Sequence, residues 1–232
     1  WDFYEFYQNI NHQIIRRTFK RDGKIVAAYA GEVEPAKRGR HLAIAGGPIL
    51  DWQDQSLVKQ VFDDMKKVAK SLQCVFVRVR PQLEYNQDSA QIFKEHNFRK
   101  APMYLSVEYA GVLDLNKTED EIMTNMRQRL RRALRKAEKN QIEIETSTNP
   151  EAIKEFYQIE LQTAKRHSFY AFSEEFLTKQ FAAFAKGGEA VLYIAKKDGE
   201  ILAENFMIFY GNEASYHYGV SSELGTKYSG AP

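Results

Sequence analysis

The chain has 232 residues, of which 44% are hydrophobic and 28% charged, and its formal net charge is +2. This balance is that of an ordinary globular protein, and no apolar stretch approaches the roughly 18 residues that a membrane-spanning helix needs. The single cysteine, Cys74, excludes an internal disulfide framework and fits a reducing compartment.

The first half begins with a predicted β-hairpin over residues 14–34, in which Asp22-Gly23 supplies the two-residue turn. A third strand, His41–Gly46, follows. Residues 54–72 then predict an amphipathic helix, because their apolar positions recur with a 3.6-residue period. The last elements predicted here are a strand, a short helix and a strand: Val75–Arg80, Ser89–His96 and Met103–Tyr109.

The second half opens with a helix predicted over residues 119–139, started by a capping box at Thr118–Glu121. A hairpin over residues 190–210, turning at Asp198-Gly199, and a strand, Ser215–Gly219, close it. Between them lie a short strand and two helices: Ile142–Thr146, Asn149 to about Arg166, and residues 174–186. Strands and helices thus alternate in both halves, which predicts an α/β (α+β) fold with mostly antiparallel sheets.

The two Asp-Gly hairpins are the most informative pattern. Each is followed at a similar distance by a strand that ends in glycine, and such a repeat is rare by chance. We therefore expect one folding unit in two copies, a first domain over 1–110 and a second over 111–232. In this alignment Pro232 corresponds to about residue 58 of the first copy. The second copy is then expected to be truncated at its C-terminus, and the chain to be a fragment of a longer protein.

A dense basic cluster lies on the predicted helix over 119–139. The helical period puts apolar residues on one side, to dock on the sheet, and cations on the other. The cationic residues are Arg127, Arg131, Arg132, Arg135 and Lys139. Five cations with few acids favour a phosphate or nucleic-acid partner, and a solvated helix face is the open alternative.

Two further positions are candidates for chemistry. Strand alternation predicts Tyr216 and Tyr218 on one face and His217 on the other, either as core residues or lining a cleft. Glu204 on the second hairpin is a candidate general base, with an outward-facing strand residue as the alternative. The five histidines have no metal-ligand spacing, so no metal site is predicted.

Several passages resemble the FemABX family of peptidoglycan aminoacyltransferases. They include Gly46–Asp51, His96–Phe98 and Val112–Leu115, and the most specific is Arg132–Lys139. The ending, Tyr218-Gly219 followed by Tyr228–Pro232, also fits. The resemblance runs from Trp1 to Pro232.

The resemblance implies two tandem GNAT-like domains with the acyl-CoA N-acyltransferase fold, of the compact type that lacks a coiled-coil arm. It also implies transfer of an amino acid from aminoacyl-tRNA to the stem-peptide amine of a peptidoglycan precursor, nucleotide-linked or lipid-linked. Neither coenzyme A nor a metal is used, which agrees with Pro232 standing where a coenzyme A loop has glycine or alanine. We expect the protein in the cytoplasm, with contact to the inner face of the plasma membrane.

The candidate site residues follow from both lines of reasoning. Tyr218 and Glu204 are the candidate catalytic residues, and the five cations of the basic helix would bind tRNA. Similar enzymes carry a precursor-binding arginine where this chain has Tyr170–Ser173, and an acid where it has Arg80. The candidate substrate-binding residues are Tyr216, Ser173, Tyr170 and Arg80. A lysine that similar enzymes place near the reacting ester would lie beyond Pro232.

Two other functions stay open. A GNAT-type N-acyltransferase acting on another amine, with acetyl-CoA, would show a regular glycine loop in a longer sequence. A non-catalytic RNA-binding module would bind RNA through the basic helix in a salt-sensitive manner without turnover.

Overall fold

The computed structural model describes residues 2–37, 39–102 and 110–228, and the chain divides into two compact units between Gly111 and Val112. The sequence predicts a domain boundary after residue 110. Each unit has its own sheet and its own hydrophobic core.

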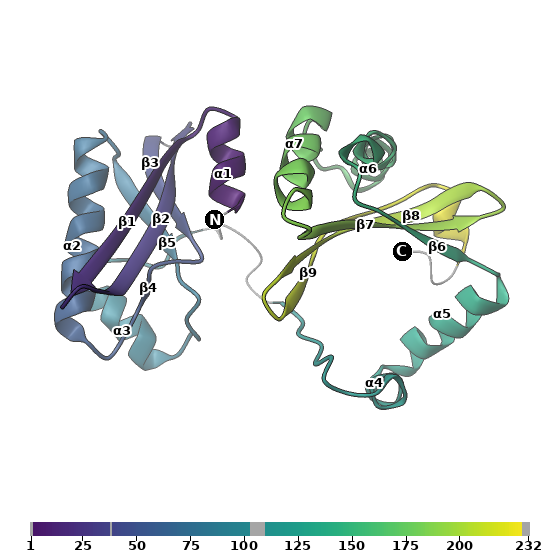
Figure 1. Ribbon diagram of the computed structural model, residues 1–232, viewed down its shortest axis with the longest axis horizontal. Helices are drawn as coiled ribbons and strands as arrows, with labels where there is room; N and C mark the ends of the chain where they lie inside the picture. Colours follow the sequence, from purple (N-terminus) through teal and green to yellow (C-terminus); the bar gives the residue numbers. More distant parts are fainter. Residues whose placement is uncertain (1, 38, 103–109, 229–232) are drawn as a thin grey trace. The chain divides into compact units, whose positions relative to one another are not determined.

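The sheet of the first unit has the strand order β1-β2-β3-β5 (Figure 1). Strands β1, β2 and β3 pair antiparallel, whereas β5 pairs parallel with β3. A two-residue strand, β4, pairs with β2 beyond the point where β3 leaves it. The strand bounds are Gln13–Arg21 (β1), Lys24–Ala36 (β2), Gly39–Ala45 (β3), Ile49–Leu50 (β4) and Phe76–Arg80 (β5).

Helix α2, Gln55–Ser71, covers one face of this sheet, and α1, Asp2–Asn9, lies on the other (Figure 1). The Asp54 side chain caps α2 by accepting a hydrogen bond from the Leu57 amide at 3.0 Å. The apolar stripe of α2, including Val58, Val61 and Phe62, is fully buried against the sheet, as its period predicts. A third helix, α3, spans Gln87–Glu95. Helix α1 is not predicted from the sequence, because no helical period is identified before residue 14.

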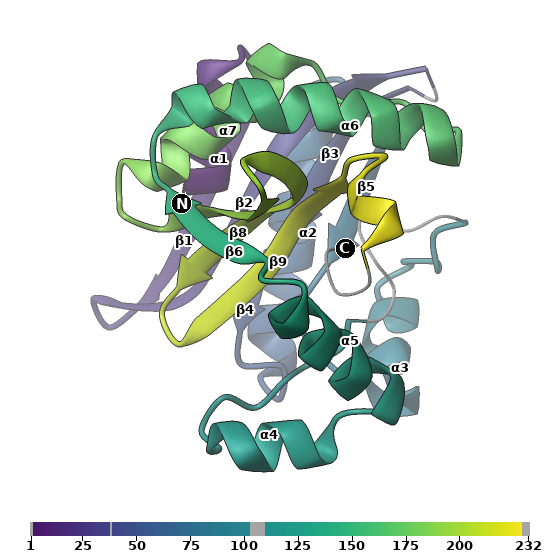
Figure 2. The ribbon, with the colours of Figure 1, turned by 90° about the vertical axis from the view of Figure 1, so that its right-hand side faces the viewer.

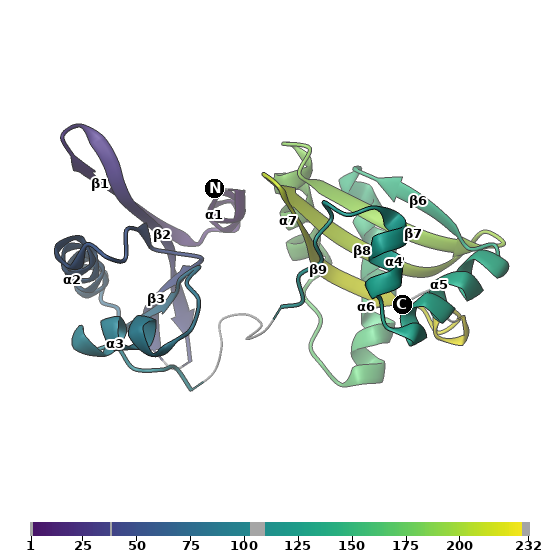
Figure 3. The same cartoon turned by 90° about the horizontal axis from the view of Figure 1, so that it is seen from below.

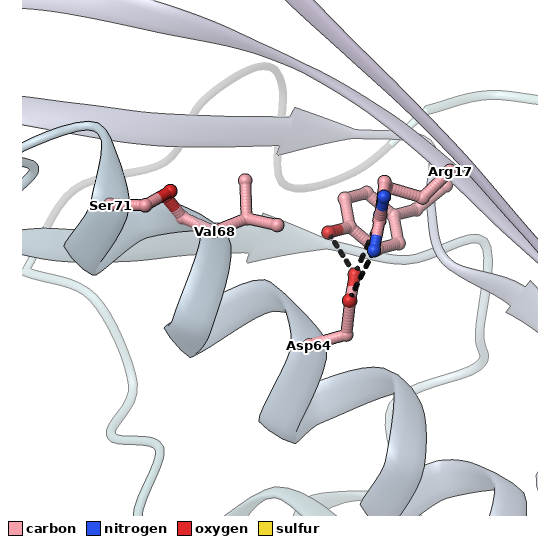
Figure 4. A network of polar contacts seen from close by, with 5 residues as sticks. Arg17, Asp64, Val68 and Ser71 are labelled. Carbon is pink, nitrogen blue, oxygen red and sulfur yellow. Dashed lines mark hydrogen bonds and ion pairs between the residues drawn. The ribbon is translucent and has the colours of Figure 1, made fainter.

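A polar network ties two strands of the first unit to α2 (Figure 4). The Arg17 guanidinium on β1 binds the Asp64 carboxylate through two bonds of 3.1 and 2.7 Å, and the Tyr29 hydroxyl of β2 donates to the same carboxylate at 2.7 Å. These bonds hold the pKa of Asp64 below its usual value, although burial acts in the opposite direction. The network fixes α2 on the hairpin.

The second unit contains an antiparallel sheet in the order β6-β7-β8-β9. Helices α6 and α7 lie side by side over one face of it, and α4 and α5 lie on the opposite side (Figures 2 and 3). The strands are Glu143–Ser147 (β6), Ala190–Lys197 (β7), Glu200–Tyr210 (β8) and Glu213–Ser221 (β9). The helices are Glu119–Asn125 (α4), Gln128–Lys139 (α5), Ile153–His167 (α6) and Glu174–Ala185 (α7), with 3-10 turns at Pro150–Ala152 and Gly225–Lys227.

The hairpins of the two units share one irregularity. In the first, Phe19 pairs with Ala27 but Lys20 pairs with Ile25, so β2 contains one extra residue. In the second, Ala195 pairs with Ala203 and Lys196 with Ile201, again three residues before the Asp-Gly turn. Both aspartates and both glycines of the turns have positive φ. The same bulge at the same place strengthens the inference of a repeated unit.

Most predicted elements are present, but the helix predicted over 119–139 is wrong in one respect. It is broken at Met126 and Arg127, which have extended backbones with ψ of 147° and 141°. The expected docking stripe is interrupted there, and neither α4 nor α5 contains a buried residue. The predicted strand Met103–Tyr109 lies outside the described residues. In the described part of the chain, no helix is long and apolar enough to cross a membrane.

Candidate functional site

A bulge in β9 brings His217 and Tyr218 together. Phe206 of β8 pairs with Tyr218 but Met207 pairs with Tyr216, so His217 is the extra residue. The rings of His217 and Tyr218 lie 4.0 Å apart between centroids, and both also contact Phe206. The predicted alternation is therefore wrong, because the bulge turns His217 to the side of Tyr218. Tyr216 is instead 67% exposed, and its hydroxyl lies over Gly219, where no Cβ would fit.

Gln180 of α7 holds both rings from the helix side. Its side chain is buried, its Oε1 lies 3.0 Å from His217 Nε2, and it also hydrogen-bonds the Tyr218 side chain. Burial lowers the pKa of His217 to about 4 and raises the pKa of Tyr218 to about 12. At neutral pH the imidazole is therefore uncharged and the phenol keeps its proton.

Glu160 of α6 adds a carboxyl group to this cluster. It is 5% exposed, and its Oε2 has no hydrogen-bond partner among the described residues. Burial raises the pKa of Glu160 to about 7, and the charge of Glu160 contributes to the raised pKa of Tyr218. The cluster thus contains a group that exchanges a proton near neutral pH next to a phenol that does not.

Glu204 of β8 is buried inside the second unit, so the outward-facing alternative is wrong. It is 3% exposed, and neither carboxylate oxygen has a hydrogen-bond partner in the part of the chain that the structure describes. Burial, followed by the negative charge of Glu155, raises the pKa of Glu204 to about 8, while Lys196 lowers it. The side chain is therefore largely a neutral acid at pH 7.

The segment between α6 and α7 brings exposed aromatic residues to the same cluster. Tyr170 is fully exposed. Phe172 stacks on Phe176 with 4.6 Å between ring centroids and lies 5.7 Å from the ring of Tyr218. The Ser173 hydroxyl accepts a hydrogen bond from the Phe176 amide at 3.1 Å and caps α7, so its first role is structural.

Four of the five candidate tRNA-binding residues are exposed: Arg132, Arg135 and Lys139 on the basic helix α5, and Arg127 directly before it. Arg131 differs, because its Nη1 donates to the carbonyl oxygens of Met123, Thr124 and Met126 at 3.2, 2.8 and 2.7 Å. The Arg131 guanidinium therefore caps the C-terminal end of α4 and stabilises the break between the two helices.

Arg80 lies in the first unit. It is the last residue of β5 and is exposed, and its carbonyl oxygen accepts a hydrogen bond from the Gly46 amide at 2.8 Å. Among the described residues, no group of three or more His, Cys, Asp or Glu is arranged to bind a metal ion.

Sequence reasoning missed Glu160 and Gln180, although a signal for both was present. Each occupies a position on the apolar stripe of its helix, with Phe156 and Ala164 four residues either side of Glu160, and Phe176 and Phe184 either side of Gln180. A polar residue at a stripe position is expected to be buried and to need a partner.

Comparisons with known proteins match both units. Residues 2–104 match the family model described as FemAB family, and residues 124–231 match the one described as Acetyltransferase (GNAT) domain. The chain is 23% identical over 223 residues to the UDP-N-acetylmuramoylpentapeptide-lysine N(6)-alanyltransferase of Weissella viridescens, covering 89% of this chain and 65% of that protein. It is 22% identical over 162 residues to the Lipid II:glycine glycyltransferase of Staphylococcus haemolyticus, covering 66% of this chain and 38% of that protein.

The fold is also similar to solved structures. The crystal structure of FemX matches 98% of this chain and 77% of its own, with a TM-score of 0.81 and 17% identity. The structure of L-PGS from Bacillus licheniformis matches 96% of this chain with a TM-score of 0.50 and 13% identity. The predicted GNAT-like α/β fold is confirmed. The chain spans less than two thirds of the length of the two relatives named above.

Proposed function

Because this chain belongs to the FemABX family, we propose that it is part of an aminoacyltransferase that adds an amino acid to the stem-peptide amine of a peptidoglycan precursor. The observation that carries the proposal is the alignment of 89% of the chain with the alanyltransferase of Weissella viridescens. The glycyltransferase of Staphylococcus haemolyticus supports the same class of reaction.

The proposed reaction joins an amine to an activated carbonyl. The acceptor amine attacks the ester carbonyl carbon of an aminoacyl donor, an amide bond forms, the ester C–O bond breaks, and the released hydroxyl takes up a proton. Catalysis of such a step depends on positioning, on hydrogen bonds to the oxyanion and on removal of the amine proton.

The cluster around Tyr218 fits these requirements. A phenol with a pKa of about 12 donates a hydrogen bond throughout the physiological range. The Glu160 carboxyl group, with a pKa of about 7, suits proton transfer near neutral pH. Glu204, with a pKa of about 8, is a second candidate on β8, next to Glu155 and Lys196. The charge of Glu160 contributes to the raised pKa of Tyr218, so we propose Glu160 as the group that exchanges the proton next to Tyr218.

The donor we propose is aminoacyl-tRNA, bound through the exposed cations of α5. Arg132, Arg135 and Lys139 are exposed on a helix whose twelve residues contain only one acid, Glu138. Such a surface fits a phosphate backbone. The proposal includes no coenzyme A and no metal ion. It places Tyr216, Tyr170 and Ser173 near the acceptor, and Arg80 as a substrate contact in the first unit.

The test is a transfer assay with the full-length protein. Radiolabelled aminoacyl-tRNAs would be supplied one at a time, with a nucleotide-linked or a lipid-linked precursor as acceptor. We expect label from at least one tRNA to appear on one precursor, and the product to yield a new amide at the stem-peptide amine. Transfer from acetyl-CoA to another amine, with no transfer from any tRNA, would contradict the proposal and favour an ordinary GNAT enzyme. RNA binding without any transfer would favour a binding module.

A further inference from the structure

The segment between α6 and α7 carries an unusual surface. Phe169, Tyr170 and Phe172 are 47%, 102% and 45% exposed, and with Ala171 they form four consecutive residues without a charged side chain. We call residues 168–173 the aromatic loop. Apolar side chains of this size are expected inside a protein or at an interface.

The base of the aromatic loop is firmly anchored, so its exposure is built into the fold. Ser168 ends α6 in the left-handed conformation at φ 56°, and the Phe169 amide donates to the Ala164 carbonyl at 3.2 Å. At the other end, Phe172 stacks on Phe176 and Ser173 caps α7. The tip, Phe169 and Tyr170, extends from these two fixed ends.

The charge next to the aromatic loop is positive. The last turn of α6 contains Lys165, Arg166 and His167, and the sequence has no acid from residue 161 to residue 173. Arg166 is fixed by hydrogen bonds of 2.9 and 2.8 Å to the carbonyl oxygen and hydroxyl of Ser221. Of the two acids that follow, Glu175 forms an ion pair with Lys179 at 2.6 Å.

We propose that the aromatic loop contacts the surface of a lipid bilayer that carries anionic headgroups. Tyrosine side chains favour the depth of the headgroups, phenylalanine side chains bury at the boundary between headgroups and acyl chains, and neighbouring cations add attraction to an anionic surface. A single-stranded RNA would stack its bases on free aromatic faces, but the ring of Phe172 already stacks on Phe176. The uninterrupted Phe-Tyr-Ala-Phe run favours the bilayer.

The position of the loop gives this contact a use, and this step rests on the proposed function. Phe172 links the aromatic loop to Tyr218 across 5.7 Å. A bilayer contact at the loop tip would therefore bring the Tyr218 cluster to the membrane surface, where an acceptor with a lipid anchor is confined. The soluble, nucleotide-linked acceptor would need no such contact.

The experiment is flotation of the full-length protein with vesicles of phosphatidylglycerol and phosphatidylcholine that contain no precursor. We expect the wild type to float, and the double variant F169S/Y170S to bind roughly tenfold less, because two aromatic side chains that would enter the bilayer surface are lost. The double variant Y85S/Y210S removes two exposed tyrosines elsewhere and should float like the wild type. Lys165→Gln should weaken binding roughly fivefold on the anionic vesicles and not on pure phosphatidylcholine.

A fluorescence measurement separates loop insertion from a general loss of structure. In the variant Y170W, tryptophan emission should shift to shorter wavelength on adding anionic vesicles and should be quenched by brominated lipid. Failure of the wild type to float, equal floating of F169S/Y170S, or loss of RNA binding alone in that variant would overturn the proposal. Vesicle binding by a protein that transfers no amino acid would overturn the proposed function and leave this inference standing.

Discussion

Glu204 is a carboxyl group that the folded second unit keeps neutral. Its folded-state pKa of about 8 lies above the usual value of 4.5, mainly because of burial. The proton is therefore held more tightly in the folded than in the unfolded chain. The stability that this proton contributes is complete below about pH 4.5 and is lost as the pH rises towards 8.

The variant E204Q tests this directly, because the amide stays neutral at every pH. We expect its free energy of unfolding, relative to the wild type, to rise by on the order of 3 kcal/mol between pH 5 and pH 8. Urea unfolding at the two pH values measures the change. The exposed Glu200 lies on the same strand, and E200Q should show no such pH-dependent difference. Equal curves for E204Q and the wild type at both pH values would show that Glu204 is ionised in the fold.

Tyr218 is the residue on which the proposed chemistry depends most. The variant Y218F keeps the ring contacts with Phe172 and Phe206 and loses the hydroxyl that bonds Gln180. We expect kcat for aminoacyl transfer to fall several-fold with little change in melting temperature. The exposed Tyr210 provides the matched control, Y210F. Turnover at the wild-type rate in Y218F would show that this hydroxyl has only a structural role.

At the scale of elements, α5 is a cationic helix that the protein does not bury. The structure distinguishes its arginines, because Arg131 caps α4 whereas Arg132 and Arg135 are exposed. We expect R132A/R135A to raise the KM for aminoacyl-tRNA roughly tenfold and to lower the slope of its dependence on log salt by about 2, one phosphate contact per arginine.

Two controls make that result specific. K20A/K24A removes two exposed cations from the hairpin of the first unit and should leave the KM unchanged. R131A should lower the melting temperature instead, because the α4 carbonyls lose their donor. An unchanged KM and salt slope in R132A/R135A would exclude tRNA from this helix.

Much of the order of elements could be predicted from sequence, because hairpin turns and helical periods are local signals. Asp22-Gly23 and Asp198-Gly199 mark both hairpins, and the stripe of α2 is buried as expected. Two features could not be predicted from these local signals. The bulge at His217 depends on the pairing with β8, which alternation along β9 alone does not contain. The break at Met126 is held by a bond from Arg131, five residues away.

The candidate site was only partly predictable for a related reason. Tyr218 and Glu204 are recognisable as residue types, but the surroundings of Tyr218 come from α6 and α7, and those of Glu204 from α6 and β7. The roles of Glu160 and Gln180 depend on which helix face meets which strand.

At the scale of the whole molecule, two sheets repeat one hairpin, including its bulge. The two hydrophobic cores share no residue. We expect Gly23→Ala and Gly199→Ala to destabilise the protein by about 1–2 kcal/mol each, because both glycines have positive φ, +76° and +82°.

Hydrogen exchange would localise the two effects. Gly23→Ala should accelerate exchange in β1 to β3, and Gly199→Ala in β7 to β9. Gly187→Ala is the control, since its Cβ would meet neighbours only at ordinary contact distance and its φ is not in the left-handed range. Faster exchange in both sheets from either turn variant would show that the units unfold as one.

In the first sheet β2 pairs with β3 along one part of its length and with β4 along another, which leaves a fork between β3 and β4. This fork makes α1 important for the first sheet. Leu50 and Ile49 of β4 pair with Ala27 and Ala28 of β2. In the second sheet, the corresponding residues of β8, Ala203 and Glu204, pair with Ser221 and Val220 of β9. Inside the fork, the Tyr4 hydroxyl lies 2.7 Å from the Ala30 carbonyl oxygen and 3.2 Å from that of Ala45. A side chain of α1 thus links β2 to the end of β3 where the two strands separate, and shortening the protein before β1 would remove this link.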